Sequence, residues 1–293
     1  MSSLQIENLF KVRGKVILVT GGSRGVGKMI TTGFVRNGAK VCGHSSSFVA
    51  ISYEGQVYIC SRSAERCNST ANELNAFGGP GICIPFPADL QKLEEVDKLV
   101  HHIVSHERSL HVLVNNAGAA WEQPIDEYSD AGFSKVLNLN VQRVFTLTQK
   151  LLPLLRAAAI TSKDGEIYRD PARIINIGSV EGLAVPHHET YAYSASKAAL
   201  HHLSRSFGGR LGWEGITSNT IACGPFESKM TASTLANDGR NRLINAIPLR
   251  RIGAPEDVAA AAIYLASPAS AYLNGATITL DGGYLISMPP SKL

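Results

Sequence analysis

The sequence has 293 residues, 44% of them hydrophobic and 18% charged, and its formal net charge is +4. This length and composition allow one sizeable core, so we expect a single domain over residues 1–293. The mild positive charge is not gathered into a basic run, so we expect no nucleic-acid partner. The sequence contains neither an apolar stretch long enough to span a membrane nor a secretory signal, so we expect no membrane association.

The five cysteines are odd in number, have no C-x-x-C spacing and form no cluster with histidines. These features favour a reducing, intracellular environment and predict no metal site.

Short β-rich runs alternate with longer segments of helical periodicity along the whole chain. This alternation is typical of βαβ units and predicts an α/β fold, a single-domain, doubly wound parallel sheet of the Rossmann-like type with helices on both faces. Strands are expected at residues 15–20, 57–61, 82–86, 111–115, 173–178, 216–222 and 276–280. Helices are expected at about 25–37, 63–77, 91–106, 134–156, 191–212 and 255–267. Residues 157–172 are predicted to form a polar loop that changes only the surface.

The first predicted strand runs directly into the segment T-G-G-S-R-G-V-G at residues 20–27, where a helix is expected to begin. Glycines at such a place permit a tight turn and a close approach of the backbone to a pyrophosphate, which the helix N-terminus then attracts. The pattern predicts a dinucleotide site. Its expected contacts are Gly21, Ser23, Arg24, Gly25, Val26 and Gly27.

The residues near the end of the second predicted strand indicate which dinucleotide binds. NAD usually requires an acidic residue there, whereas a 2′-phosphate requires cations. Arg24 lies in the glycine segment, Arg62 follows the strand, and no Asp or Glu occupies the strand end. The pair favours NADP(H), although both arginines could instead be solvated surface residues.

Residues 41–56 (VCGHSSSFVAISYEGQ) interrupt the second predicted strand–helix unit. Deleting them restores the run G-A-K-V-Y-I-C-S-R-S, and a valine codon begins with GT while a glutamine codon can end with AG. Two interpretations stay open: a translated retained intron, or a genuine surface loop near the adenosine site.

Tyr193 and Lys197 are four residues apart at the start of a predicted helix, so both side chains lie on one face. A nearby ammonium favours phenolate, so we expect Lys197 to lower the pKa of Tyr193 and make the tyrosine a proton-transfer group.

Together with the glycine segment, this Tyr-x-x-x-Lys pattern resembles the short-chain dehydrogenase/reductase family, and the resemblance covers nearly the whole chain. The supporting motifs are the segment 20–27, Asp89, Asn115-Asn116-Ala117-Gly118, Asn140, Ser179, Tyr193 with Lys197, and Asp281-Gly282-Gly283. Two features depart from the family pattern: Cys223-Gly224 replaces the usual Pro-Gly, and the spacing from Ser179 to Tyr193 is one residue longer than the commonest one.

The resemblance implies a role for each matching residue. Tyr193 would be the general acid, Ser179 would hold and polarise the substrate carbonyl, Lys197 would grip the nicotinamide ribose, and Asn140 would hold a water of the proton relay. The other implied cofactor contacts are Asp89 and Leu90 beside the adenine, Asn116 behind the cofactor, and Phe226 and Ser228 after the sixth strand. His187 and His188 could contact the substrate or be solvated.

The implied activity is NADPH-dependent reduction of a carbonyl to a secondary alcohol, with a 3-oxoacyl thioester or a related ketone as the expected substrate. Two alternatives stay open, an enoyl-thioester reductase and a non-catalytic NADPH-binding protein, but the complete Asn140, Ser179, Tyr193 and Lys197 set favours a carbonyl. The family resemblance further implies a homodimer or a homotetramer.

The chain ends in Ser291-Lys292-Leu293, preceded by two prolines that should keep the tail at 284–293 extended. This tripeptide is a signal that the peroxisomal import receptor reads, so the expected location is the peroxisome.

Overall fold

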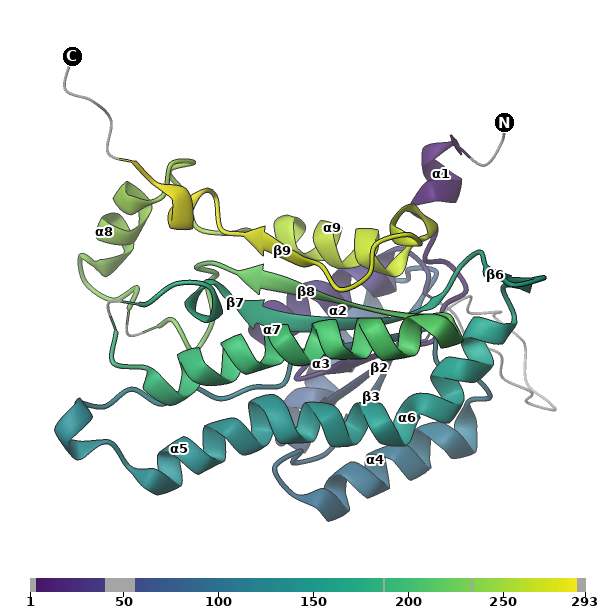
Figure 1. Cartoon of the computed structure of the whole chain (residues 1–293), viewed down its shortest axis with the longest axis horizontal. Helices are drawn as coiled ribbons and strands as arrows, with labels where there is room; N and C mark the ends of the chain where they lie inside the picture. The colour runs from purple at the N-terminus through teal and green to yellow at the C-terminus, as the bar shows by residue number, and fades with distance from the viewer. Residues whose placement is uncertain (1–3, 40–55, 187, 233, 289–293) are drawn as a thin grey trace.

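A seven-stranded parallel sheet forms the centre of the computed structural model, which describes residues 4–39, 56–186, 188–232 and 234–288 (Figure 1). The strands lie in the order β3-β2-β1-β4-β7-β8-β9. Because the chain runs outward from β1 to β3 and then returns to β4 on the other side of β1, the strand order reverses between β1 and β4, where this type of sheet binds its ligands. The strands are β1 (Ile17–Thr20), β2 (Gln56–Ser61), β3 (Ile82–Pro87), β4 (Val112–Asn115), β7 (Ala172–Ser179), β8 (Ile216–Cys223) and β9 (Thr277–Leu280).

The predicted doubly wound sheet is confirmed, because its central strands are buried on both faces. Every residue of β1, β4, β7 and β8 is buried. Side chains alternate along a strand, so Ile17 and Val19 enter one hydrophobic core while Leu18 enters the other. These short segments are therefore stable as central strands because their apolar side chains pack into a core on each face of the sheet.

Helices cover both faces of the sheet, as the sequence predicts. One core contains Phe34, Leu74 and Val258 from α2 (Gly25–Arg36), α3 (Ala64–Ala76) and α9 (Pro255–Ala266). The other core contains side chains from α4 (Leu93–His106), α6 (Arg143–Ile160) and α7 (Tyr191–Leu211), which lie together in front of the sheet in Figure 1. Within the described residues, no helix is both long enough and apolar enough to cross a membrane.

The helix predicted at 134–156 differs from the structure. It consists of α5 (Asp130–Leu137), a π-helical turn (Asn138–Gln142) and α6, which continues to Ile160. Ala158 and Ala159 are buried in the core, and this burial extends the helix past its predicted end.

The prediction that residues 157–172 form a loop affecting only the surface is wrong. After the last turn of α6, a small hairpin forms from β5 (Lys163–Asp164) and β6 (Ile167–Tyr168). The carboxylate of Asp170 then forms ion pairs with two buried cations, Lys15 at 2.6 Å and Arg173 at 2.9 Å. The segment therefore neutralises two buried cations, one just before β1 and one at the start of β7.

Two helices were not predicted, α1 (Ile6–Leu9) and α8 (Gly239–Ala246), and neither contains a buried residue. Short 3-10 turns occupy Ile125–Glu127, Val180–Gly182, Gly212–Glu214, Pro268–Ser270 and Tyr284–Ile286. Three sequence predictions fall outside the described residues: His187, the terminal tripeptide at 291–293, and the insertion at 41–56 except for Gln56, which is the first residue of β2.

Candidate active site

A cavity of about 1500 Å³ lies at the carboxyl ends of the strands, where the fold predicts a ligand. Its walls include the residues that end or follow five strands, namely Gly21, Ser61, Asn116, Ser179 and Cys223. Of the expected site residues that the structure describes, only Asn140 does not line it. The cavity therefore brings the glycine segment and the Tyr193/Lys197 pair together.

The glycine segment bends tightly between β1 and α2. Gly21 and Gly25 have φ angles of +67° and +50°, which side-chain-bearing residues rarely adopt. A Cβ atom on Gly27 would lie 2.3 Å from the carbonyl oxygen of Gly21, so only glycine fits there. Asn116 supports the turn from behind, because its Nδ2 donates to the carbonyl oxygens of Thr20 at 2.8 Å and Gly21 at 3.2 Å.

This segment has the features of a phosphate cradle. No side chain caps the N-terminus of α2, where Arg24 is the N-cap residue. The buried hydroxyl of Ser23 has no hydrogen-bond partner among the described residues. Free donors beside a helix N-terminus fit a pyrophosphate, so the residues present match the predicted dinucleotide.

Cations gather at the adenosine end of the cavity. Arg24 and Arg62 line it as predicted, together with Asp89 and Leu90. Arg66, on the first turn of α3, also lines it and was missed. The available signal was a basic residue at the start of the helix that follows the second strand, close to Arg62 in the sequence.

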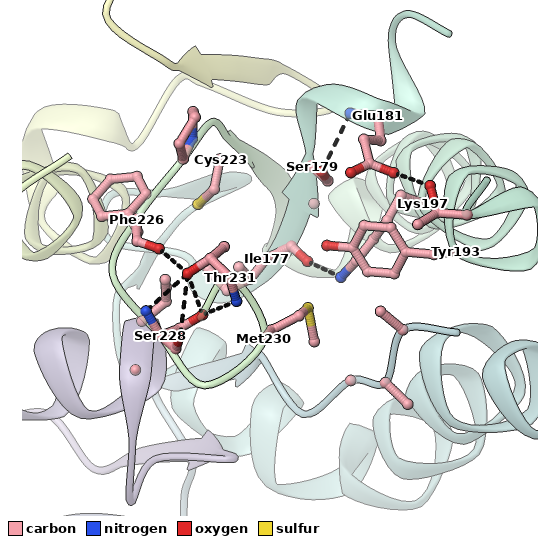
Figure 2. Close-up of a pocket in the computed structure, with 18 of the residues that line it drawn as sticks. Ile177, Ser179, Glu181, Tyr193, Lys197, Cys223, Phe226, Ser228, Met230 and Thr231 are labelled. Atoms are coloured by element: carbon pink, nitrogen blue, oxygen red, sulfur yellow. Dashed lines mark hydrogen bonds between the residues drawn. The ribbon is translucent and has the colours of Figure 1, made fainter. Parts of the chain in front are cut away.

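The catalytic end combines Ser179 at the end of β7 with Tyr193 and Lys197 on the first turns of α7 (Figure 2). Lys197 Nζ donates to the carbonyl oxygen of Ile177 at 2.7 Å and lies 5.5 Å from the centre of the Tyr193 ring. The spacing argument is confirmed, since both side chains face the same cavity.

The predicted lowering of the Tyr193 pKa by Lys197 is wrong in this structure. Burial raises the pKa of the Tyr193 phenol above its ordinary value, and a hydrogen bond with Ser179 opposes part of that rise. Burial also lowers the pKa of Lys197 to about 8. Desolvation is the largest cause of the rise in the Tyr193 pKa, while the Lys197 ammonium donates its hydrogen bond to the carbonyl oxygen of Ile177.

Asn140 lies in the π-helical turn, behind the cavity wall. Its Nδ2 donates to the carbonyl oxygen of Ala119 and to Ser196 Oγ, both at 2.9 Å, while its Oδ1 accepts from the N–H of Ala119. The side chain therefore joins the loop after β4 to α7, and the relay water stays a prediction.

The loop after β8 closes the nicotinamide end. Phe226 and Ser228 line the cavity as predicted. Thr231, which was missed, accepts from the N–H of Ser228 at 3.0 Å and donates to the carbonyl oxygen of Phe226 at 2.7 Å (Figure 2). Cys223 is buried beside Lys197, and burial raises the pKa of its thiol to about 12, so it stays protonated.

Two polar residues around Ser179 were also missed. Glu181 lines the cavity, and its Oε2 accepts from Thr190 Oγ1 at 2.6 Å and Ser194 Oγ at 3.2 Å. His201 lies behind the cavity wall, where its Nε2 accepts from the backbone N–H of Ser179.

His188 lines the cavity and pairs with Glu122 at 3.3 Å. Among the described residues, no cluster of histidine, cysteine or acidic side chains could hold a metal ion.

Comparisons with known proteins agree with this geometry. Residues 49–285 match the family model described as "Enoyl-(Acyl carrier protein) reductase". The chain is 42% identical over 277 residues to the rhamnolipids biosynthesis 3-oxoacyl-[acyl-carrier-protein] reductase of Pseudomonas aeruginosa, covering 94% of this chain and 98% of the relative. The chain belongs to the short-chain dehydrogenase/reductase family. It is therefore an oxidoreductase, which confirms the expectation of an enzyme.

One more relative and one solved structure extend the comparison. The 5-keto-D-gluconate 5-reductase of Escherichia coli is 29% identical, over 97% of this chain and 100% of its own length. The solved structure described as the Pseudomonas aeruginosa RhlG/NADP active-site complex is 41% identical, has a TM-score of 0.81 and matches 94% of this chain and 98% of its own. The relatives thus include enzymes named for acyl substrates and for sugar-acid substrates.

Proposed function

We propose that this short-chain dehydrogenase/reductase uses NADPH to reduce the carbonyl of a 3-oxoacyl thioester, or of a related ketone, to a secondary alcohol. The observation that carries the proposal is the meeting of Ser179, Tyr193 and Lys197 in the cavity that the glycine segment also lines. A protein that only bound the cofactor would need the glycine segment but no proton-transfer group.

The residues at the adenosine end would hold the cofactor. The glycine segment and the unpartnered Ser23 hydroxyl suit its pyrophosphate, and Arg24 and Arg62 suit a 2′-phosphate. The 41% identical Pseudomonas aeruginosa structure is an NADP complex, which supports the same assignment. When bound, the cofactor supplies the hydride, and the protein supplies orientation.

Tyr193 is suited to act as the general acid. Because burial raises its pKa, the phenol keeps its proton at neutral pH and can donate it to a developing alkoxide. The Ser179 hydroxyl, placed at the end of β7, would hold the carbonyl oxygen against that phenol. With a pKa of about 8, Lys197 is mostly charged at neutral pH and stabilises the phenolate left behind.

The choice of an acyl substrate rests on the relatives and on the cavity wall. The 42% identical relative is named as a 3-oxoacyl-[acyl-carrier-protein] reductase. Apolar side chains that line the substrate end suit an acyl chain; they include Val185, Met230, Leu285 and Met288.

A second candidate reaction is reduction of an enoyl thioester, which the description of the matching family model favours. A carbon–carbon double bond, however, has no oxygen at the reduced position for Ser179 and Tyr193 to hold. Purified chain should be assayed for NADPH oxidation with acetoacetyl and crotonyl thioesters of the same carrier. Faster oxidation with the acetoacetyl compound supports the proposal, and turnover of the crotonyl compound alone would refute it.

We also propose that the terminal Ser291-Lys292-Leu293 directs the chain to peroxisomes through the import receptor. A fluorescent protein fused to the N-terminus should gather in peroxisomes and disperse when Leu293 is deleted.

Assembly as a homodimer or homotetramer stays a prediction, which sedimentation equilibrium would test.

A further inference from the structure

The carboxylate of Glu181 is placed where it can act on the substrate. Glu181 lies two positions after Ser179, and its backbone N–H donates to Ser179 Oγ at 3.2 Å. Its side chain lines the same cavity as Tyr193 and Lys197. Figure 2 shows it beside Ser179, next to the helix that carries both residues. The proposed mechanism leaves this group without a role.

Hydrogen bonds fix the position of this carboxylate. Oε2 accepts from Thr190 just before α7 and from Ser194 just after Tyr193. Thr190 is buried, with 7% of its surface exposed. These contacts hold the carboxylate at the N-terminus of α7, where a negative charge is favoured. Its charge therefore stays close to the reacting groups.

No cation neutralises Glu181 through direct contact, since none of the described residues forms a salt bridge with it. The other carboxylates that line the cavity lie elsewhere: Glu122 pairs with His188, and Asp89 lies at the adenosine end. Lys197 interacts electrostatically with Glu181, but its ammonium donates to the carbonyl oxygen of Ile177 and forms no salt bridge with the carboxylate. The exposed cations Lys135, Lys229 and Arg250 line the cavity from other segments of the chain. A bound substrate thus meets a negative charge next to its reacting carbonyl.

We propose that Glu181 is a specificity-determining residue, which favours carbonyl substrates with no charge near the reacting carbon and rejects those with a carboxylate a few bonds away. This inference rests on the proposed carbonyl reduction and narrows its substrate class. Like charges about 6 Å apart at a partly buried site repel strongly enough to lower binding on the order of tenfold to a hundredfold. A neutral 3-oxoacyl group escapes this repulsion, whereas a keto sugar acid does not.

The test compares ethyl acetoacetate with acetoacetate, which share one reacting carbonyl and differ by one charge. Wild-type enzyme should prefer the ester in kcat/KM. In Glu181→Gln, which keeps an oxygen that can accept from Thr190 and Ser194, the ester-to-acid ratio should fall by at least about tenfold. A ratio that stays within about twofold of wild type overturns the inference.

Two control variants separate charge from positioning. Thr190→Val removes the 2.6 Å hydrogen bond but keeps the charge, so it should slow both substrates alike and preserve the ratio. Glu122→Gln removes the carboxylate that pairs with His188 and should also preserve the ratio. If Glu181→Gln merely slows both substrates equally, Glu181 has only a structural role and the proposal is wrong.

A binding measurement keeps this inference distinct from the proposed reaction. Calorimetric titration of the NADPH-loaded chain with the ester and with the acid gives the ratio of the two binding affinities, which does not depend on turnover. If no variant turns over either compound but the binding ratio still depends on Glu181, the reaction is wrong and the specificity role stands. If turnover occurs and neither ratio depends on Glu181, the reaction stands and the specificity role fails.

Discussion

The backbone N–H of Ser179 donates a hydrogen bond to Nε2 of His201, with 3.4 Å between the two nitrogen atoms. Only 2% of His201 is exposed, and its Nδ1 has no hydrogen-bond partner among the described residues. Because Nε2 accepts, the ring is neutral, and burial lowers the pKa of His201 to about 4. A buried imidazole therefore supports the strand end that carries the proposed carbonyl-binding hydroxyl.

This pKa predicts a loss of stability in acid. The unfolded chain takes up a proton near the ordinary histidine value of 6.5 and the folded chain only near 4, so the stability is full above pH 6.5 and falls as the pH falls towards 4. The expected loss from His201 is about 2 kcal/mol at pH 5. Urea unfolding at pH 7 and pH 5 should show a smaller difference in His201→Leu. His202→Leu, a change at the exposed neighbour, should keep the wild-type difference, and an unchanged difference in His201→Leu would contradict the prediction.

Asp170 should be far more important to stability than its place after a surface hairpin suggests. Asp170→Ala leaves the cations Lys15 and Arg173 without the carboxylate that pairs with both. Both cations are buried, with exposed fractions of only 6% and 1%. We expect a loss of about 3 kcal/mol in the free energy of unfolding. Asp164→Ala in the same hairpin breaks only an exposed pair with Arg169 and should cost less than about 1 kcal/mol. Equal losses in the two variants would show that the buried cations find other partners.

Local patterns in the sequence were sufficient for the sheet and for much of the site. β1 and β7 are predictable because buried parallel strands are continuous apolar runs, and Tyr193 with Lys197 because helix spacing alone puts them on one face. Asp170 could not be predicted as a structural residue, because its partner Lys15 is distant in the sequence. Glu181 was missed for a similar reason, since its importance appears only when the start of α7 folds against it.

The helices, too, could be predicted only where the local sequence pattern determines them. The polar α8 was missed because it buries nothing, so no hydrophobic periodicity marks it. The π-helical turn around Asn140 was missed because its sequence continues the helical pattern of α5 and α6. Its position is set by tertiary hydrogen bonds to Ala119 and Ser196.

Gly27→Ala should damage both cofactor binding and stability. The added methyl group would lie 2.3 Å from the Gly21 carbonyl oxygen, a backbone atom that can move only by reshaping the phosphate turn. We expect a loss of about 1–3 kcal/mol in unfolding free energy and weaker NADPH binding. Gly209→Ala on α7 meets no atom within 4 Å and should stabilise the chain by up to about 1 kcal/mol. Thermal unfolding and NADPH fluorescence titration of both variants check this contrast. Wild-type NADPH affinity in Gly27→Ala would contradict the assignment of the glycine segment as the phosphate cradle.

Arg62→Ala should weaken NADPH binding and leave NADH binding nearly unchanged. The guanidinium lines the adenosine end, and it would contact only the 2′-phosphate that NADH lacks. Loss of one charge-assisted contact predicts about tenfold to a hundredfold weaker NADPH binding. Arg205→Ala, an exposed change on α7, serves as the control for net charge. If Arg62→Ala weakens both cofactors equally, the arginine supports the adenosine pocket in some other way.

Tyr193→Phe should abolish most of the turnover while sparing the cofactor site. Removing the phenolic hydroxyl removes the proposed proton donor, so kcat should fall by about 10²–10⁴-fold. NADPH affinity should stay within about threefold of wild type, because a phenyl ring fills the same space. Tyr191→Phe is the matched control, since Tyr191 is exposed and its hydroxyl donates to Glu189 rather than facing Ser179. Steady-state assays with an acetoacetyl thioester, paired with fluorescence titration, separate chemistry from binding. Wild-type turnover in Tyr193→Phe would mean that another group protonates the substrate, and the cavity-lining His188 would be the next residue to replace.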